Sequence, residues 1–325
     1  MSAIERWSVD RAARWIRRPV PGDDKYRRGV LGVRTGSAAY PGAAVLGVSA
    51  AWRAGVGMLR YVPPLEDPDA PFGLPAPAAA VLAARPETVF GEAGSRPCDA
   101  WVIGSGTDPG ARSFAEGEAL RRILAGDAPV VVDAGALRLA ADTRSDRSAP
   151  LILTPHLGEF ARLWDASGLG PLPGDWPGRG EPGDPGLLSD AAATLARRLG
   201  ATVLLKGSTT LCATPEGGCV AAGPATPWLA SAGTGDVLAG LLGALVCAHA
   251  GEVRADPERL GELGASAAVL HDLAARIAAG DPDARGAGRP ITARDVAEAI
   301  PAAIERVPHR GSPRSAVKDV RHNGT

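Results

Sequence analysis

Short apolar runs that alternate with longer amphipathic segments are the feature that most limits how this chain can fold. Most of these runs have four or five residues and are followed by a segment with helical spacing. The runs are VLGV at 30–33, MLRYV at 58–62, AWVIG at 100–104, PVVVD at 129–133, LILT at 151–154 and TVLLK at 202–206. Strands of this kind, each followed by a helix, indicate a mostly parallel sheet covered by helices on both faces.

A hairpin and a loop set the expected limits of the domain. TTLCAT and GCVAA, joined by PEGG, are typical of a β-hairpin, so the sheet should carry an antiparallel addition. Because strands lie on both sides of the Gly- and Pro-rich loop 166–187, we expect one domain over 23–307. Residues 1–22 are expected to form an N-terminal extension, and residues 308–325 a disordered tail.

Composition excludes several classes of protein. The 325 residues include 35 Lys and Arg against 36 Asp and Glu, so no basic surface for nucleic acid is expected. No apolar run approaches the roughly 20 residues of a membrane span. The charged N-terminus lacks the apolar core of a signal peptide, and the four cysteines form no C-x-x-C pair. We therefore expect a cytoplasmic protein that contacts neither nucleic acid nor membrane and holds no zinc.

A glycine-rich turn precedes a helical segment in WLASAGTGDVLAG at 228–240. Apolar residues recur with helical spacing from Val237 onward, so Asp236 is expected where that helix begins. Backbone N–H groups of Gly233, Thr234 and Gly235 would then form an anion hole at the positive end of the helix. The motif alone leaves two interpretations of Asp236: an N-cap that accepts backbone hydrogen bonds, or a base that deprotonates a hydroxyl beside a bound anion.

Other polar residues follow strand ends, where parallel α/β sheets bind ligands. Lys206 ends TVLLK and precedes Gly-Ser-Thr-Thr at 207–210, so we interpret it as a phosphate ligand rather than a solvated lysine. His156 in LTPHLGEF is interpreted as a site residue, with a capping histidine as the alternative. Asp133 could orient water or Mg²⁺ around a phosphate, or cap the following turn. Neither a Walker sequence nor a dinucleotide fingerprint is present.

Taken together and in order, these motifs resemble the ribokinase-like superfamily and, more narrowly, the ADP-dependent NAD(P)H-hydrate dehydratases. TPHLGEF together with KGSTT and AGTGD is more specific than Gly-x-Gly-Asp alone, which sugar and vitamin kinases share. The matching stretches cover roughly 23–280 and also include DKYRRGVLGVRTGSAAYPGAAVLGVSAAWRAGVG, VIGSGTD and VVVDAGAL. The resemblance implies a three-layer α/β/α sandwich around a mostly parallel sheet.

The resemblance also implies a reaction. The family repairs NADH and NADPH in which water has added across the nicotinamide C5–C6 double bond. The terminal phosphate of ADP or ATP moves to the C6 hydroxyl with the help of Mg²⁺, and its loss restores the reduced ring. Carried over by position, Asp236 is the catalytic base. The expected nucleotide contacts are Lys206, Gly207, Ser208, Thr209, Thr210 and Gly235, and the expected contacts of the hydrate are Ala43, Gly106, His156 and Asp236.

Partners follow from the same resemblance. A homo-oligomer is expected, with a tetramer as its suggested form. Some members carry an epimerase domain before this core, and only about 20 residues precede it here, so we expect the NAD(P)HX epimerase to be a separate chain. Two positions depart from the family pattern. At Arg34-Thr35 the family usually has small apolar and glycine residues, and at Ser231-Ala232 it commonly has threonine followed by glycine.

Two other functions stay open at this point. A small-molecule kinase acting on a hydroxymethylpyrimidine, a thiazole or pyridoxal would keep Asp236 and the anion hole and release a stable phosphorylated product. TPHLGEF argues against it. A nucleotide-binding homologue without turnover is the second alternative, against which Asp236 and Lys206 argue only weakly. The sequence decides neither ADP against ATP nor NADHX against NADPHX.

Overall fold

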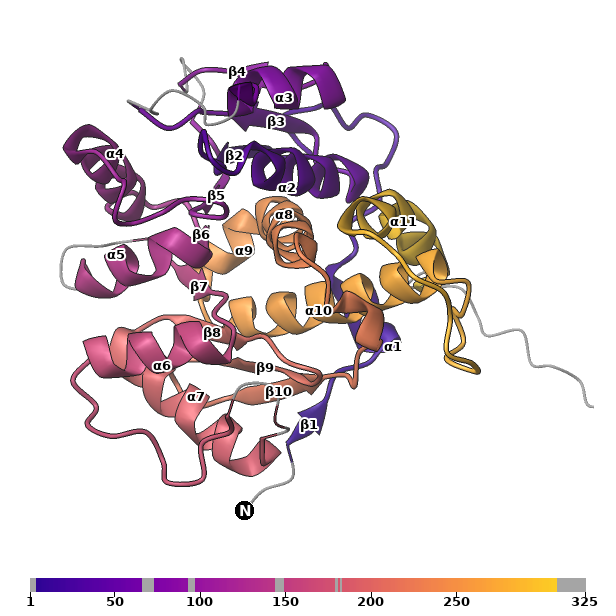
Figure 1. Cartoon of the computed structure of the whole chain (residues 1–325). Coiled ribbons are helices and arrows are strands. Elements are labelled where there is room, and N and C mark those ends of the chain that lie inside the picture. Colours follow the sequence, from indigo (N-terminus) through magenta and orange to yellow (C-terminus); the bar gives the residue numbers. More distant parts are fainter. Residues whose placement is uncertain are drawn as a thin grey trace, which may run out of the picture.

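The computed structural model describes residues 4–65, 73–92, 97–143, 149–178, 181 and 183–308, which share one ten-stranded sheet (Figure 1). The strands are β1 (Glu5–Arg6), β2 (Val30–Arg34), β3 (Met58–Tyr61), β4 (Val89–Phe90), β5 (Ala100–Ile103), β6 (Val130–Val132), β7 (Leu151–Leu153), β8 (Thr202–Leu205), β9 (Thr210–Ala213) and β10 (Cys219–Ala222). Their order is β1-β10-β9-β8-β7-β6-β5-β2-β3-β4. Neighbours are parallel except where β9 meets β8 and β10. The predicted sheet and its antiparallel hairpin are confirmed.

Helices cover both faces of the sheet, which gives the predicted three layers (Figure 1). They are α1 (Val9–Ala12), α2 (Pro41–Arg53), α3 (Pro77–Ala84), α4 (Phe114–Leu124), α5 (Leu137–Asp142), α6 (Leu157–Ala166), α7 (Pro185–Leu199), α8 (Thr234–Ala248), α9 (Ala250–Ala255), α10 (Arg259–Ala278) and α11 (Ala293–Arg306). α2, α8, α10 and α11 pack in one core cluster, and α4 to α7 pack in the other.

The strands β5, β6 and β7 at the middle of the sheet are apolar at every position because helices cover both of their faces. Val131 belongs to the core under α8 and α10, whereas its neighbours Val130 and Val132 belong to the core under α5 and α6. Successive side chains of a strand point to opposite faces, so alternation with polar residues is impossible here. This is why the strands appear in the sequence as short unbroken apolar runs.

Two glycines let α2 and α8 approach closely and thereby place the start of α8. A Cβ at Gly240 would lie 2.1 Å from the carbonyl oxygen of Gly47. A Cβ at Gly47 would lie 3.5 Å from the carbonyl oxygen of Asp236. The backbones of the two helices are therefore in contact, and the first turn of α8 lies against α2.

The N-terminal segment is part of the domain rather than an extension that precedes it. Glu5 and Arg6 form β1, which pairs with β10, and Trp7 donates a hydrogen bond from Nε1 to Ser266 Oγ at 2.8 Å. The pairing covers the edge that β10 would otherwise leave open. Nothing in the local sequence marks this contact, because its partners lie more than 200 residues away.

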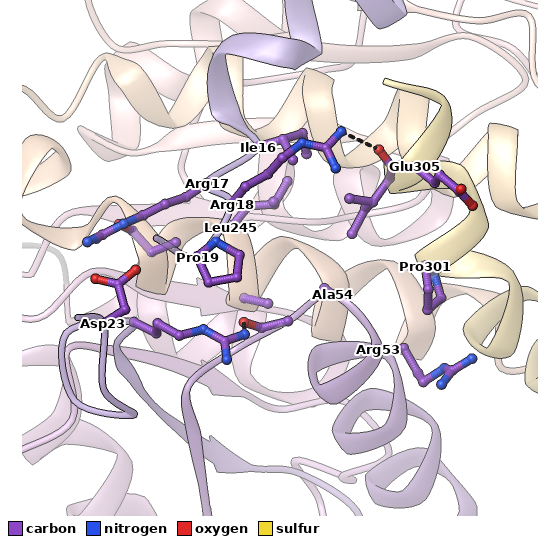
Figure 2. Close-up of a pocket in the computed structure, with 15 residues that line it drawn as sticks. Ile16, Arg17, Arg18, Pro19, Asp23, Arg53, Ala54, Leu245, Pro301 and Glu305 are labelled. Carbon is purple, nitrogen blue, oxygen red and sulfur yellow. Dashed lines mark hydrogen bonds between the residues drawn. The ribbon is translucent and has the colours of Figure 1, made fainter. Parts of the chain in front are cut away.

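Arginines of the following segment bind the C-terminal ends of three helices around a cavity of about 230 Å³ (Figure 2). Arg17 donates to the carbonyl oxygen of Ala248 at 3.4 Å, next to the end of α8. Arg18 donates to Ile304 and Val307 at the end of α11, and Arg28 donates to Gly55 beyond α2. Helix C-termini carry unpaired carbonyls and partial negative charge. These contacts therefore tie residues 17–28 to the domain.

The Gly- and Pro-rich connection is shorter than predicted. α6 ends at Ala166 and α7 begins at Pro185, where Asp184 accepts a hydrogen bond from Leu187 N at 2.7 Å as the N-cap. Trp176 of the connection stacks on Phe160 with ring centroids 4.9 Å apart. The predicted disordered tail lies outside the described residues beyond 308. No helix in the described ranges is both long and apolar enough to cross a bilayer.

Candidate active site

A buried ion pair connects the carboxyl ends of two parallel strands. Lys206, directly after β8, donates from Nζ to Asp133 Oδ1 at 2.8 Å, and Asp133 directly follows β6. Thr154 Oγ1 also donates to Asp133 Oδ1, and Ser105 Oγ donates to Oδ2 at 2.9 Å. Asp133 makes no side-chain capping bond to the turn that follows it. It holds Lys206 instead, and neither of the two predicted roles of Asp133 included this.

The charges of the pair stabilise each other. Burial opposes ionisation of Asp133, but Lys206 and the hydrogen bonds to its carboxylate outweigh burial and hold its pKa below 3.8. Burial also opposes the charged form of Lys206, but nearby carboxylates raise the pKa of the ammonium above 10.5; they are Asp133, Glu159 and Asp236. Lys206 is therefore a preformed cation with an almost buried side chain, not the solvated lysine of the alternative interpretation.

Asp236 lies in the first turn of α8 but does not cap it. The N-cap is Gly233 with φ +88°, and α8 begins at Thr234, so Gly235 lies inside the helix and Asp236 is its third residue. No side-chain capping bond is present. Burial, with added repulsion from Asp133 and partial relief from Lys206, raises the pKa of the Asp236 carboxyl from 3.8 to about 6. A carboxylate with this pKa is matched to accepting a proton near neutral pH.

The amides beside Asp236 are suited to an anion. Thr234 N donates to Ser231 O at 3.4 Å, a long bond. The N–H groups of Gly235 and Asp236 have no partner within the described part of the chain. Unpaired N–H groups at the positive end of a helix bind phosphate oxygens.

His156 caps α6 and also reaches the site. Its Nδ1 accepts hydrogen bonds from Gly158 N and Glu159 N, and Glu159 Oε2 accepts from His156 N, which completes a capping box. The capping interpretation of His156 is correct. Because Nδ1 is an acceptor, the ring proton lies on Nε2, so a half-exposed N–H donor remains available to a ligand.

A cavity of about 500 Å³ gathers most of the predicted nucleotide contacts. We call it the nucleotide cavity. Lys206, Gly207, Ser208, Thr210 and Gly235 line it together with His156. Thr209 is not among its lining residues, although both of its neighbours are. The segment 226–230 and helix α10 close the opposite side.

Ala43 and Gly106, the other two predicted contacts of the hydrate, meet each other. Gly106 has φ +65°, and a Cβ there would lie 2.3 Å from Ala43 Cβ. Ala43 is one turn before Gly47 on the helix that contacts the start of α8. The loop after β5, the start of α2 and the first turn of α8 therefore converge, as the positional carry-over requires.

Sequence reasoning missed two contributors to the site. His271 on α10 lines the nucleotide cavity, its Nε2 is buried without a hydrogen-bond partner, and burial lowers the pKa of its ring to about 4. The second contributor is Glu159, whose Oε2 lies 3.9 Å from Lys206 Nζ and also accepts the hydrogen bond that completes the capping box of α6. A histidine inside an apolar helix carries no local signal that it faces a ligand.

Arg34, a departure from the family pattern, is a buried partner of Glu116. Its Nε lies 2.9 Å from Glu116 Oε1, and its second amino group lies 2.5 Å from Oε2. Glu116 also accepts from Leu65 N at 2.9 Å. The unusual arginine is thus compensated by a bidentate carboxylate and lies at the end of β2, beside the site.

The charges around Lys206 bear on how a metal ion would bind at this site. Among the described residues, no three His, Cys, Asp or Glu side chains are grouped so as to hold a metal ion. Lys206 faces three carboxylates, so a nucleotide polyphosphate would bring further negative charge to an already acidic region. This charge balance fits Mg²⁺ that enters on the phosphates, because Mg²⁺ commonly keeps waters and binds through one or two carboxylates plus phosphate oxygens.

The three-layer α/β/α fold is that of ribokinase-like proteins, and its carboxyl edge carries a lysine, free helix amides and a buried aspartate. Solved structures share the fold. A Bacillus subtilis ADP/ATP-dependent NAD(P)H-hydrate dehydratase, co-crystallized with ATP/Mg²⁺, superposes with a TM-score of 0.73 at 24% identity over 95% of this chain and 100% of that one. A ribokinase-like protein of Enterococcus faecalis gives 0.69 at 20% identity, covering 94% and 97%.

The chain belongs to the NAD(P)H-hydrate dehydratase family, whose model matches residues 31–301. It is 43% identical over 247 residues to the bifunctional NAD(P)H-hydrate repair enzyme Nnr of Mycobacterium tuberculosis, covering 74% of this chain and 45% of that protein. It is 34% identical over 236 residues to an ADP-dependent (S)-NAD(P)H-hydrate dehydratase of Xanthomonas campestris, covering 69% and 74%. The chain thus spans about half the length of the mycobacterial relative.

Proposed function

We propose that this chain is an ADP-dependent (S)-NAD(P)H-hydrate dehydratase, a lyase that restores NADH and NADPH from their hydrates. The observation that carries the proposal is Asp236, a partly buried carboxylate with a pKa of about 6 beside Lys206 and the free amides of α8. Family membership supports the choice of substrate.

In the proposed reaction, Asp236 accepts the proton of the C6 hydroxyl as that oxygen attacks the terminal phosphorus of the nucleotide. The bond from this phosphorus to its bridging oxygen breaks, and AMP leaves when the donor is ADP, or ADP when the donor is ATP. The amides of Gly235 and Asp236 stabilise the charge on the transferred phosphoryl group. The C6–O bond then breaks, phosphate leaves, and loss of a proton from C5 restores the C5–C6 double bond. Ala43 and Gly106 would hold the nicotinamide ring against the first turn of α8, and His156 would donate a hydrogen bond from Nε2 to the hydrate.

The nucleotide would occupy the nucleotide cavity. Lys206 supplies the positive charge for its phosphates, while Gly207, Ser208 and Thr210 supply backbone and hydroxyl donors from the cavity lining. A contact of the nucleotide with Thr209, which does not line the cavity, stays a prediction. Mg²⁺ would be held mainly by the phosphates, with Glu159 as the nearby carboxylate whose second oxygen has no partner in the described chain. Bound there, Mg²⁺ supplies charge neutralisation during phosphoryl transfer.

The proposal is tested by incubating the protein with NADHX or NADPHX, Mg²⁺ and either ADP or ATP, and following absorbance of the reduced nicotinamide near ~340 nm. We expect nucleotide-dependent absorbance that is lost in Asp236→Asn, because removal of a general base costs about 10²–10⁴-fold. Nucleotide binding without any NADH or NADPH would contradict the proposal. A stable phosphorylated product from a pyrimidine, thiazole or pyridoxal alcohol would instead establish the kinase alternative.

Partners and location remain proposals. Relatives named bifunctional carry two activities in one chain, so epimerisation by a separate chain stays a prediction. A supply of the R hydrate alone tests it: turnover should begin only when an epimerase is added. The homo-oligomer, with a tetramer as its suggested form, and the cytoplasmic location also stay predictions, to be checked by light scattering and by cell fractionation.

A further inference from the structure

A second cavity, of about 430 Å³, opens beside the nucleotide cavity. We call it the α5–α6 cavity after the two helices that form its sides. Thr107 and Gly135 line it at the sheet, and Arg138, Glu159 and Arg162 line it from the helices. Glu159 also faces Lys206, so the Glu159–Lys206 contact separates the two cavities.

Arg162 brings to the α5–α6 cavity a guanidinium that no carboxylate of the described residues pairs with. It lies three residues after Glu159 on α6, and its exposed guanidinium has no hydrogen-bond or ion-pair partner in the ranges that the structure describes. Arg138 on the opposite helix is paired with Asp142 at 2.8 Å. A guanidinium fork matches phosphate geometry, so an uncompensated arginine at a cavity favours a phosphate ligand.

The backbone beneath this cavity is held in an unusual conformation. Ala134 has φ +43°, in the left-handed region that non-glycine residues rarely adopt. A Cβ at Gly135 would lie 2.2 Å from the carbonyl oxygen of Thr107, so these two loops touch through their backbones. Strained backbone of this kind concentrates at ligand sites, and here it leaves a floor without large side chains.

The proposed substrate needs a second compartment. A hydrated dinucleotide consists of two nucleotide units joined by a diphosphate, and only its nicotinamide ring has to reach Asp236. Gly106 precedes Thr107, and His156 caps the helix that carries Glu159 and Arg162. Residues next to both predicted contacts of the hydrate, Thr107 and Glu159, therefore line the α5–α6 cavity.

A competing compartment has the wrong charge for a diphosphate. A cavity of about 210 Å³ lies between the loop after β2 and α4, lined by Arg34, Asp108, Ala111, Arg112 and Glu116 among others. Arg34 is neutralised by Glu116 at hydrogen-bond distance, and Arg112 donates to the carbonyl oxygen of Gly135 and lies near the carboxylates of Glu116 and Asp108. The α5–α6 cavity is both larger and electrostatically better suited.

We infer that the α5–α6 cavity binds the diphosphate arm of the dinucleotide substrate, with Arg162 as the specificity-determining residue that holds it. The inference rests on the proposed function and extends it to residues outside the family's Gly-x-Gly-Asp and lysine motifs. It separates the two ligands in space: the phosphate donor binds on the Lys206 side of Glu159, and the arm of the acceptor binds on the Arg162 side.

The test is Arg162→Ala compared with Arg122→Ala, an exposed arginine of α4 that lines neither cavity. We expect KM for NADPHX to rise on the order of 10- to 100-fold in Arg162→Ala, because a hydrogen bond to a charged group is lost. KM for ADP and kcat should stay unchanged, and Arg122→Ala should behave as the wild type. An equal rise of KM for ADP in Arg162→Ala would overturn the inference.

A second readout does not depend on turnover. NADPH carries the same diphosphate arm, so fluorescence titration without any phosphate donor should show weaker NADPH binding to Arg162→Ala and an intermediate Kd for Arg162→Lys. Ala111→Trp fills the competing cavity and should leave this Kd unchanged. Weaker binding in Ala111→Trp with normal binding in Arg162→Ala would overturn the inference. A wild type without dehydratase activity would refute the proposed function, while this titration would still decide the role of Arg162.

Discussion

Asp236→Asn should abolish turnover and at the same time stabilise the fold. The wild-type carboxyl ionises at about 6 in the folded chain, against 3.8 ordinarily, because it is buried next to another carboxylate. At about 1.4 kcal/mol per pKa unit, this difference lowers the free energy of unfolding by about 3 kcal/mol at neutral pH. Asparagine carries no charge, so the substitution removes that destabilisation.

The sign follows from proton binding. Between pH 3.8 and about 6 the folded chain holds the Asp236 proton more tightly than the unfolded chain does, so wild-type stability falls as pH rises through this window. The advantage of Asp236→Asn should therefore be absent below pH 3.8, grow up to about pH 6, and stay constant above it. For 325 residues the unfolding entropy is about 0.7 kcal/mol/K, so the expected rise in Tm is about 4 °C at pH 8.

Asp295→Asn is the matched control, because Asp295 is also the third residue of a helix, α11. It accepts hydrogen bonds from Thr292 in a capping box, which lower the pKa of its carboxyl. Its stabilisation is present above its unfolded pKa and is lost as pH falls, so Asp295→Asn should lower Tm at pH 8. Calorimetric scans from pH 4 to 8 measure both variants. A Tm for Asp236→Asn at or below that of the wild type at pH 8 would refute the reasoning, as would activity of the wild type that does not decline below about pH 6.

The other predictions concern contacts that hold the site together. Lys206→Met leaves the buried carboxylate of Asp133 without a cation and should lower the free energy of unfolding in urea by about 3–5 kcal/mol. It should also weaken ADP binding measured by calorimetry. A urea midpoint equal to that of the wild type would show that the pair contributes nothing to stability. Gly106→Ala places a methyl group at φ +65° and 2.3 Å from Ala43, and should cost about 1–3 kcal/mol and raise KM for the hydrate more than KM for ADP. Arg34→Met should cost about 3–5 kcal/mol by stranding Glu116, and adding Glu116→Leu should recover most of it; no recovery would mean that the arginine matters for packing rather than charge.

The sheet and the positions of several site residues could be read from the sequence. Apolar runs of strand length with helices between them leave few alternatives to a parallel sheet, and each run ends where a ligand can bind. Lys206, His156 and Asp236 follow such runs or begin a helix, and all three lie at the carboxyl edge. These inferences needed only local spacing, which is why they could be made without coordinates.

The chemistry of those residues was decided by tertiary contacts. Asp133 and Lys206 are 73 residues apart, and only the order of the strands brings them to hydrogen-bond distance. The same contacts bury Asp236 near Asp133, so its raised pKa belongs to the folded arrangement and not to the Gly-Thr-Gly-Asp motif. His271, in contrast, faces the nucleotide cavity from α10, where no neighbouring residue in the sequence marks a ligand site.

The N-terminal segment shows the same difference between what its local sequence predicts and what its tertiary contacts decide. Its sequence shows a short charged segment before the first predicted strand, and this pattern predicts an extension. The structure pairs Glu5 and Arg6 with β10 and sets Arg17 and Arg18 on the ends of α8 and α11. Local spacing thus determined which segments form strands and helices, because hydrophobic periodicity is a property of neighbouring residues. The pairing of the sheet edge, the arginine contacts at helix ends and the pKa values were decided by the tertiary structure, because they depend on groups far apart in the sequence meeting at one place.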